Sequence, residues 1–175
     1  MNTQKNSKET IERIHERLNG SMTLKDLAGA SANYTQGSGK IDVSGLVTDS
    51  RRVTPGAAFF ALPGMRTNGN EHLQEALDRG AKVIISENEE LDLPLGITGL
   101  QVDDSRLALA KFAKRYHGSP DSSLRVMGIT GTNGKTTVSS LIRHLMERPG
   151  RPVGLIGTVR YHLGDREVPS FKTTP

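Results

Sequence analysis

The sequence contains no cysteine. This absence excludes disulfides and thiolate metal sites, and it fits a reducing compartment. No apolar run approaches the ~20 residues that a membrane-spanning helix needs, so we expect no membrane insertion. The N-terminus, MNTQKNSKET, has no apolar stretch behind its charges, which argues against a secretory signal. We therefore expect a cytoplasmic protein.

Clustered charge is also lacking. The net charge of +4 is spread along the chain, which favours an ordinary solvated surface over a nucleic-acid-binding patch. The five histidines show no metal-ligand spacing, and only His72 lies beside a loop of functional interest. Hydrophobic residues make up 34% of the 175 residues and charged residues 24%, as in globular rather than disordered proteins. We expect a monomer of one large domain or two small ones, with no nucleic-acid partner.

The first part of the chain alternates helix and strand patterns. A short amphipathic helix is expected within residues 1–20. The apolar run AAFFAL (57–62) predicts a buried strand, residues 73–80 a helix ending at a glycine, and AKVIISE (81–87) another strand. This alternation predicts a small α/β domain over residues 1–103.

A second domain is expected over residues 104–175. Asp104 or Ser105 can cap its first helix, on which Leu109, Phe112 and Tyr116 share one apolar face. Further along, LRVMGIT (124–130) predicts a strand, GTNGKTT (131–137) a loop, and VGLIGTV (153–159) a second strand. Between the loop and the second strand, a helix should have a core face formed by Val138, Leu141, Ile142 and Leu145. The fold class is therefore α/β, with one βαβ unit at the start of a P-loop ATPase domain.

The loop at 131–137 has the residues that bind a nucleotide's phosphates. Gly131 and Gly134 free backbone N–H groups to curl around phosphate oxygens, and Lys135 can reach the β and γ phosphates. The Thr136 hydroxyl is placed to bind Mg²⁺, and Thr137 offers another hydroxyl at the helix start. The residues predicted to contact ATP are Gly131, Thr132, Asn133, Gly134, Lys135, Thr136 and Thr137.

The loop departs from the general pattern G-x-x-x-x-G-K-[ST], which would place its first glycine at Ile129. A glycine-rich turn capping an ordinary helix is the alternative. The strand pattern before the loop and the amphipathic helix after it favour nucleotide binding. In detail, GITGTNGKTT (128–137) resembles the ATP loop of the Mur ligase superfamily, whose members read T-G-T-N-G-K-T.

Other stretches narrow the resemblance, which covers about residues 22–175. The segment from TDSRR to VIISE (48–87) resembles the uridine-nucleotide-binding N-terminal domain of these ligases. GLIGTVRY (154–161), followed by KTTP (172–175), is similar to the E-type members. The resemblance implies an ATP-dependent ligase of peptidoglycan synthesis that adds the third amino acid to UDP-MurNAc-dipeptide through an acyl phosphate. ATP, Mg²⁺, the dipeptide precursor and an amino acid are the implied cofactors and substrates.

The resemblance also implies roles for single residues. Lys135 would act in catalysis by spreading the charge of the transferring phosphoryl group. Lys172 stands where many family members have Asn, a departure from the family pattern. The implied substrate-binding residues are Thr48 and Ser50 at the uridine diphosphate, Met65, Arg66 and Thr67 in a loop over uracil and diphosphate, and Thr173 and Thr174 at the muramoyl-peptide end.

Three alternatives stay open at this point. The chain could be a stand-alone UDP-MurNAc-peptide-binding module, or part of another ligase of the superfamily. An unrelated small P-loop kinase would need an acidic metal ligand at the end of a later strand, and 153–159 ends in Thr158 and Val159. The family's remaining metal ligands and its amino-acid-binding domain have no counterpart in these residues, so we expect the 175-residue chain to be inactive by itself.

Overall fold

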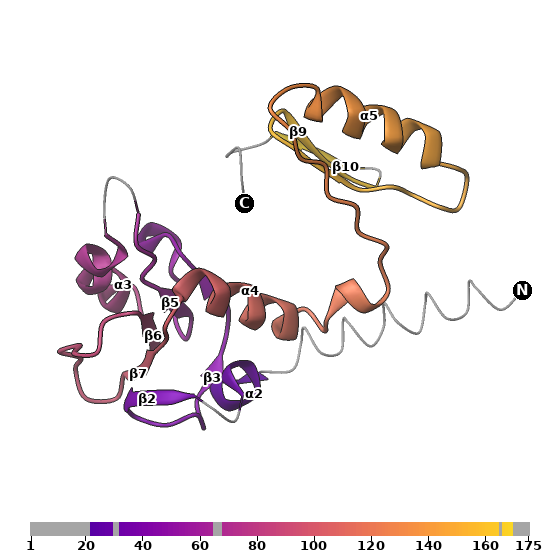
Figure 1. Ribbon diagram of the computed structural model, residues 1–175. Coiled ribbons are helices and arrows are strands. Elements are labelled where there is room, and N and C mark those ends of the chain that lie inside the picture. The colour runs from indigo at the N-terminus through magenta and orange to yellow at the C-terminus, as the bar shows by residue number, and fades with distance from the viewer. Residues whose placement is uncertain (1–21, 30–31, 65–67, 165, 170–175) are drawn as a thin grey trace, which may run out of the picture. The chain divides into compact units, whose positions relative to one another are not determined.

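The computed structural model describes residues 22–29, 32–64, 68–164 and 166–169 (Figure 1). The chain divides into two compact units, Met1–Leu124 and Arg125–Pro175. The helix expected within residues 1–20 lies outside the described residues. No helix in the described ranges has the length and apolarity required to cross a bilayer.

The first unit is built on a five-stranded sheet with the order β2-β7-β6-β5-β4 (Figure 1). Strands β4 to β7 are parallel, and β2 pairs antiparallel with β7 at one edge. The predicted strands at 57–62 and 81–87 are confirmed as the adjacent strands β5 and β6. The five strands are β2 (Asn33–Gln36), β4 (Leu46–Val47), β5 (Ala58–Phe60), β6 (Val83–Ser86) and β7 (Thr98–Gln101).

Helices α2 (Leu24–Ala28) and α4 (Ser105–Tyr116) cover one face of this sheet. A two-stranded sheet of β1 (Met22–Thr23) and β3 (Asp42–Val43) flanks α2. Because alternate strand residues point to opposite faces, Phe60 and not Phe59 meets these helices. The Phe60 ring packs edge-on against the ring of Phe112 on α4, with centroids 5.3 Å apart.

The opposite face packs against α3 (Leu73–Asp78). Phe59 and Ile84 point to this side and are buried with Ala76 of α3. Short 3₁₀ turns lie in several connections. η1 (Ser50–Arg52) follows β4, η2 (Gly69–His72) leads into α3, and η3 (Pro120–Ser122) follows α4. The sheet with helices on both faces confirms the predicted α/β class for this unit.

Helix α4 belongs to the first unit. The Asp104 carboxylate caps it by accepting the Leu107 N–H at 2.9 Å, as the sequence predicted. Phe112 lies in the core of the first unit, and the Tyr116 hydroxyl donates to the Ser44 carbonyl at 2.9 Å. The predicted boundary lay before Asp104, whereas the structure divides the chain after Leu124 because the apolar face of α4 packs on the first sheet.

In its described residues, the second unit has one helix and an antiparallel sheet with the order β10-β9-β8. These elements are α5 (Lys135–Met146), β8 (Leu155–Ile156), β9 (Arg160–Leu163) and β10 (Arg166–Pro169). Within the described residues, the segment 124–130 pairs with no strand and runs as a single extended trace (Figure 1). The expected βαβ pairing is therefore wrong here. Strand β8 finds its partner in the adjacent β9 instead of lying parallel to 124–130.

Candidate functional site

The carboxyl ends of the parallel strands bring the predicted substrate residues to one edge of the first sheet. Thr48 and Ser50 follow β4, and the β5–η2 loop (residues 61–68) follows the neighbouring strand β5. In open α/β sheets, ligands bind outside this edge. Ser50 and the described ends of the loop after β5 therefore follow neighbouring parallel strands at one edge of the sheet, while the predicted roles of these residues stay predictions. Five predicted contacts lie outside the described residues: Met65, Arg66, Thr67, Thr173 and Thr174.

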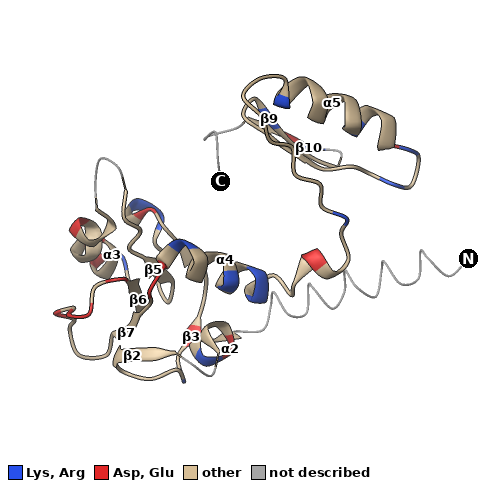
Figure 2. Cartoon of the chain, in the orientation of Figure 1, with Lys and Arg blue, Asp and Glu red and all other residues tan. Residues whose placement is uncertain are grey.

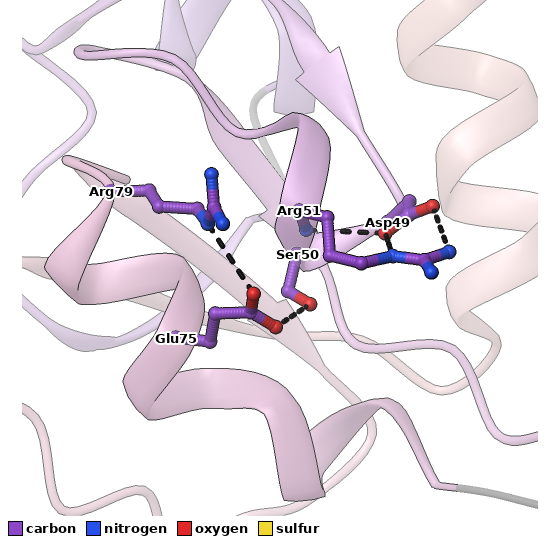
Figure 3. Close-up of polar contacts among 5 residues, drawn as sticks. All are labelled: Asp49, Ser50, Arg51, Glu75 and Arg79. Carbon is purple, nitrogen blue, oxygen red and sulfur yellow. Dashed lines mark hydrogen bonds and ion pairs between the residues drawn. The ribbon is translucent and has the colours of Figure 1, made fainter.

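Ser50 makes a short contact with an acidic residue that the sequence analysis did not identify. Its hydroxyl donates to Oε2 of Glu75 on α3 at 2.5 Å (Figure 3). Glu75 is also paired with Arg79 one turn later, with Nε 3.4 Å from Oε1. The hydrogen bond from Ser50 is the main cause that lowers the pKa of Glu75, with a further contribution from Arg79. The i,i+4 spacing of Glu75 and Arg79 was the only signal in the sequence.

Asp49 and Arg51 form a second, separate pair. The Arg51 guanidinium donates from Nε and Nη2 to the two carboxylate oxygens of Asp49, at 2.9 and 2.8 Å. Asp49 also accepts the Arg51 N–H and so caps η1. The hydrogen bond from the Arg51 side chain is the main cause that lowers the pKa of Asp49 to about 2. This pair points away from Ser50 and Glu75 (Figure 3), and its charges already compensate each other.

The two ends of the β5–η2 loop are held together. Pro63 and Asn68 form an isolated antiparallel bridge, and the Gly69 N–H donates to the Leu62 carbonyl at 2.9 Å. Gly69 lies so close to the chain before the loop that an added Cβ would sit 2.6 Å from the Leu62 nitrogen. Arg106 of α4 donates from Nη2 to the Pro63 carbonyl at 2.8 Å. These contacts hold the two described ends of the loop, residues 61–64 and 68, close together.

Buried hydroxyl groups form hydrogen bonds where the next strand, β6, ends at the same edge of the sheet. Ser86, the last residue of β6, donates from Oγ to Oδ1 of Asn70 at 2.8 Å and accepts the Asn88 N–H. Glu87 accepts both the N–H and the hydroxyl of Ser105, at 2.9 and 2.7 Å. Because Ser86 and Ser105 are fully buried, these bonds order the connections to η2 and α4.

Several basic residues of the first unit lie on α4 (Figure 2). They are Arg106, Lys111, Lys114 and Arg115. Lys114 pairs with Asp121 at 2.7 Å, and Arg115 donates to the Leu27 carbonyl. Since Arg106 is engaged at the base of the β5–η2 loop, most of this positive charge serves contacts within the unit.

The predicted phosphate loop leads directly into α5, whose first residue is Lys135. Gly134 precedes it in the left-handed conformation (φ 79°), which glycine adopts without the steric cost of a Cβ. In the described part of the chain, the backbone N–H groups of residues 131–137 have no hydrogen-bond partner. The Lys135 ammonium lies over the loop and donates to the carbonyls of Gly131 and Thr132, at 2.6 and 3.3 Å. Free N–H groups at a helix start suit the oxygens of a phosphate.

The loop fits the phosphates of ATP better than it fits a complete Mg²⁺ site. The predicted metal ligand Thr136 is exposed, as is the rest of the loop. Within the described ranges, no three His, Asp or Glu side chains come together in a way that could hold a metal ion. The role of Thr136 as a Mg²⁺ ligand stays a prediction of the sequence.

Comparison with known proteins matches two successive segments to two parts of one family. Residues 42–117 match the model described as "Mur ligase family, catalytic domain", and residues 129–175 match "Mur ligase middle domain". The first match covers the parallel sheet and α4, and the second covers the phosphate loop and α5.

Individual relatives agree with these matches. The chain is 42% identical over 155 residues to the UDP-N-acetylmuramoyl-L-alanyl-D-glutamate--2,6-diaminopimelate ligase of Geobacter metallireducens. These 155 residues cover 88% of this chain and 30% of the relative. A solved structure of a ligase with the same name has a TM-score of 0.68 at 25% identity, covering 86% of this chain and 30% of that one. A MurF structure from Acinetobacter baumannii has a TM-score of 0.58 at 28% identity, covering 73% and 28%. The chain thus spans about a third of the length of the proteins it matches.

Proposed function

The chain belongs to the Mur ligase family, and from that premise we propose that it is the N-terminal part of an ATP-dependent ligase of peptidoglycan synthesis. The whole protein adds the third amino acid to UDP-MurNAc-dipeptide. The relatives' names give 2,6-diaminopimelate as that amino acid, and we propose the same for this protein. The observation that carries the proposal is the order of the two matched segments, each with its site residues at a fold position suited to nucleotides.

The first unit binds the uridine diphosphate end of the precursor. Thr48 and Ser50 lie at the carboxyl edge of a parallel sheet, the usual ligand edge of such folds. The described ends of the β5–η2 loop are held by Arg106 and by the close approach of Gly69 to Leu62. Ordered loop ends of this kind lower the entropic cost of binding a ligand beside them.

The second unit supplies the phosphate-binding part of the ATP site. ATP provides the phosphoryl group that activates the carboxylate of the dipeptide. The N–H groups of residues 131–137 bind phosphate oxygens, and the Lys135 ammonium exchanges its bonds to the Gly131 and Thr132 carbonyls for phosphate. Thr136 offers its hydroxyl to Mg²⁺. We place the reaction in the cytoplasm and expect the chain to act as a monomer.

Calorimetric titration of the 175-residue chain tests the proposal. UDP should bind, and Mg·ATP should bind more weakly than micromolar, because few of its contacts lie in these residues. Ser50→Ala should weaken only UDP, and Lys135→Ala should weaken only ATP. No amide bond should form from UDP-MurNAc-dipeptide, ATP and diaminopimelate above the level of a Lys135→Ala control. Failure of wild-type chain to bind UDP would refute the proposal.

A second function, that of a stand-alone UDP-MurNAc-peptide-binding module, is favoured by one observation. The first unit has a closed core, whereas no described residue of the second unit is buried. If the chain acts as a binding module, UDP-MurNAc-dipeptide will bind with equal affinity to wild-type chain and to Lys135→Ala, and Mg·ATP will not change that affinity. Coupling between the two ligands would favour the ligase instead.

A further inference from the structure

The contact between Ser50 and Glu75 determines which hydrogen-bonding role Ser50 can take. Ser50 is only 6% exposed, and its hydroxyl lies 2.5 Å from Glu75 Oε2. Glu75 reaches it from α3, a different element, and its side chain is 40% exposed (Figure 3). The two residues therefore form a small polar site that opens to solvent at the edge of the sheet where the substrate is expected.

The hydrogen in this contact belongs to Ser50. The pKa of Glu75 is lowered by the hydrogen bond from Ser50 and by Arg79, so the carboxyl group is ionised at neutral pH and can only accept. The Ser50 hydroxyl has a single hydrogen, and Glu75 takes it. Toward a ligand, Ser50 Oγ can therefore only accept a hydrogen bond.

A phosphate is a poor ligand for such a pair. Phosphate oxygens need donors, and both Ser50 Oγ and the Glu75 carboxylate are acceptors at this point. Arg79, whose Nε lies 3.4 Å from Oε1 of Glu75, compensates the charge of that carboxylate, so the site also has no net positive charge to attract an anion. The nucleoside half of a uridine nucleotide, in contrast, carries neutral donors: the ribose hydroxyls and the N3–H of uracil.

We propose that Ser50 and Glu75 form an acceptor pair that selects a hydrogen-bond donor of the uridine moiety rather than the diphosphate. In this proposal, which rests on the proposed function, Ser50 contacts the nucleoside. Glu75 is a positioning residue that holds the Ser50 hydroxyl hydrogen away from the ligand. The pair thereby gives selectivity for the nucleoside that a hydroxyl free to rotate would not give.

The experiment measures dissociation constants of the 175-residue chain by calorimetry. The ligands are UDP, pyrophosphate, and three UDP analogues that each lack one donor: 2′-deoxy-UDP, 3′-deoxy-UDP and UDP methylated at N3. The variants are Ser50→Ala and Glu75→Gln, with Gln74→Ala as a matched control, because Gln74 on α3 bonds to Asp78 and not to Ser50. Circular dichroism checks that each variant is folded.

We expect one analogue to bind wild-type chain about 10-fold more weakly than UDP, as for the loss of one hydrogen bond. Ser50→Ala should weaken UDP by a similar factor and should not weaken that analogue further. In Glu75→Gln the side-chain amide can donate to Ser50, so the preference for UDP over the analogue should fall to less than 3-fold. Pyrophosphate binding should not weaken in either variant, and Gln74→Ala should match wild type throughout.

Two results would overturn the inference while UDP still binds. One is a loss on Ser50→Ala that is the same for pyrophosphate as for UDP, which would make Ser50 a phosphate contact. The other is that Ser50→Ala weakens the binding of every analogue by the same factor by which it weakens the binding of UDP. This result would mean that Ser50 contacts none of the three donors. If wild-type chain does not bind UDP at all, the proposed function fails together with the inference, and this outcome is distinct from the other two.

Discussion

Helices α4 and α5 have similar apolar patterns and different surroundings. Both are 12 residues long, and the sequence predicts one apolar face on each. On α4, Phe112 is 3% exposed because it packs on the sheet of the first unit. On α5, Leu141 and Leu145 are 56% and 65% exposed. An amphipathic helix therefore predicts where a core could form, whereas burial requires a sheet face of matching size beside it.

The apolar extended segments of the two units also differ in whether they have a neighbouring strand. Each residue of β5 has a neighbouring strand on the β6 side and, for most of its length, on the β4 side. The segment 124–130 has four apolar residues among seven but no partner among the described strands, and Val126 is 78% exposed. The first unit consequently has the parts of an independently stable fold, and the second has the predicted phosphate loop and a helix beside a small sheet with no buried residue in the described part.

The largest expected effect on stability comes from truncating a buried apolar side chain of the first unit, compared with truncating an exposed one of the second unit. Phe60→Ala should destabilise the chain by about 3–5 kcal/mol, because it removes a buried ring from the first core and its contact with Phe112. Leu141→Ala should change the stability by less than about 0.5 kcal/mol. Urea unfolding followed by far-UV circular dichroism measures both, and equal losses would show that the face of α5 is buried.

A glycine exchange tests whether the loop base is as tightly packed as the core. Gly69→Ala should cost about 1–3 kcal/mol, because the new Cβ would meet the backbone of Ala61 and Leu62 at under 3 Å. It should also weaken UDP binding by displacing the β5–η2 loop. Gly45→Ala is the matched control, since nothing lies within 4 Å of its added Cβ. A neutral Gly69→Ala in the same unfolding assay would contradict the close packing at Gly69.

The second unit can be perturbed by itself at the start of α5. Gly134→Ala should cost about 1 kcal/mol locally, because alanine is strained at a φ of 79°. The ¹³Cα chemical shifts of residues 135–146 should report less helix, while the urea midpoint of the first unit stays unchanged. Gly128→Ala, a position with open space, should leave both unchanged. A shift of the first unit's midpoint would show that the two units unfold together.

The sequence was sufficient where short-range patterns decide the structure. The apolar runs around Phe59 and Ile84, and the cap at Asp104, are confirmed because burial of a continuous run and capping depend on neighbouring residues. The contacts of Glu75 and Arg106 were missed because each joins residues more than twenty positions apart. The pairing of 124–130 was predicted wrongly for the same reason. A strand forms only where another strand pairs with it, and the local composition of a segment does not determine which strand that is.

The smallest expected effect concerns the exposed pair of Asp49 and Arg51, which contrasts with the partly buried contact between Ser50 and Glu75. The folded-state pKa of Asp49 is depressed to about 2 from an ordinary value of 3.8. The pair therefore contributes stability that is present above the ordinary value and is lost as the pH falls toward the folded value. Since the pair is exposed and screened by solvent, this contribution should be small at pH 6.

Asp49→Asn keeps a capping oxygen for η1 but removes the charge, so it isolates the ion pair. The stability difference between wild type and this variant should be measurable by urea unfolding at pH 6 and low salt. It should shrink between about pH 4 and pH 2, because wild-type Asp49 then gains the proton that removes its charge. Arg51→Gln should give a similar loss at pH 6, and the double variant should lose no more than either single one. A difference that persists at pH 2 would assign the effect to the cap of η1 and not to the charge of Asp49.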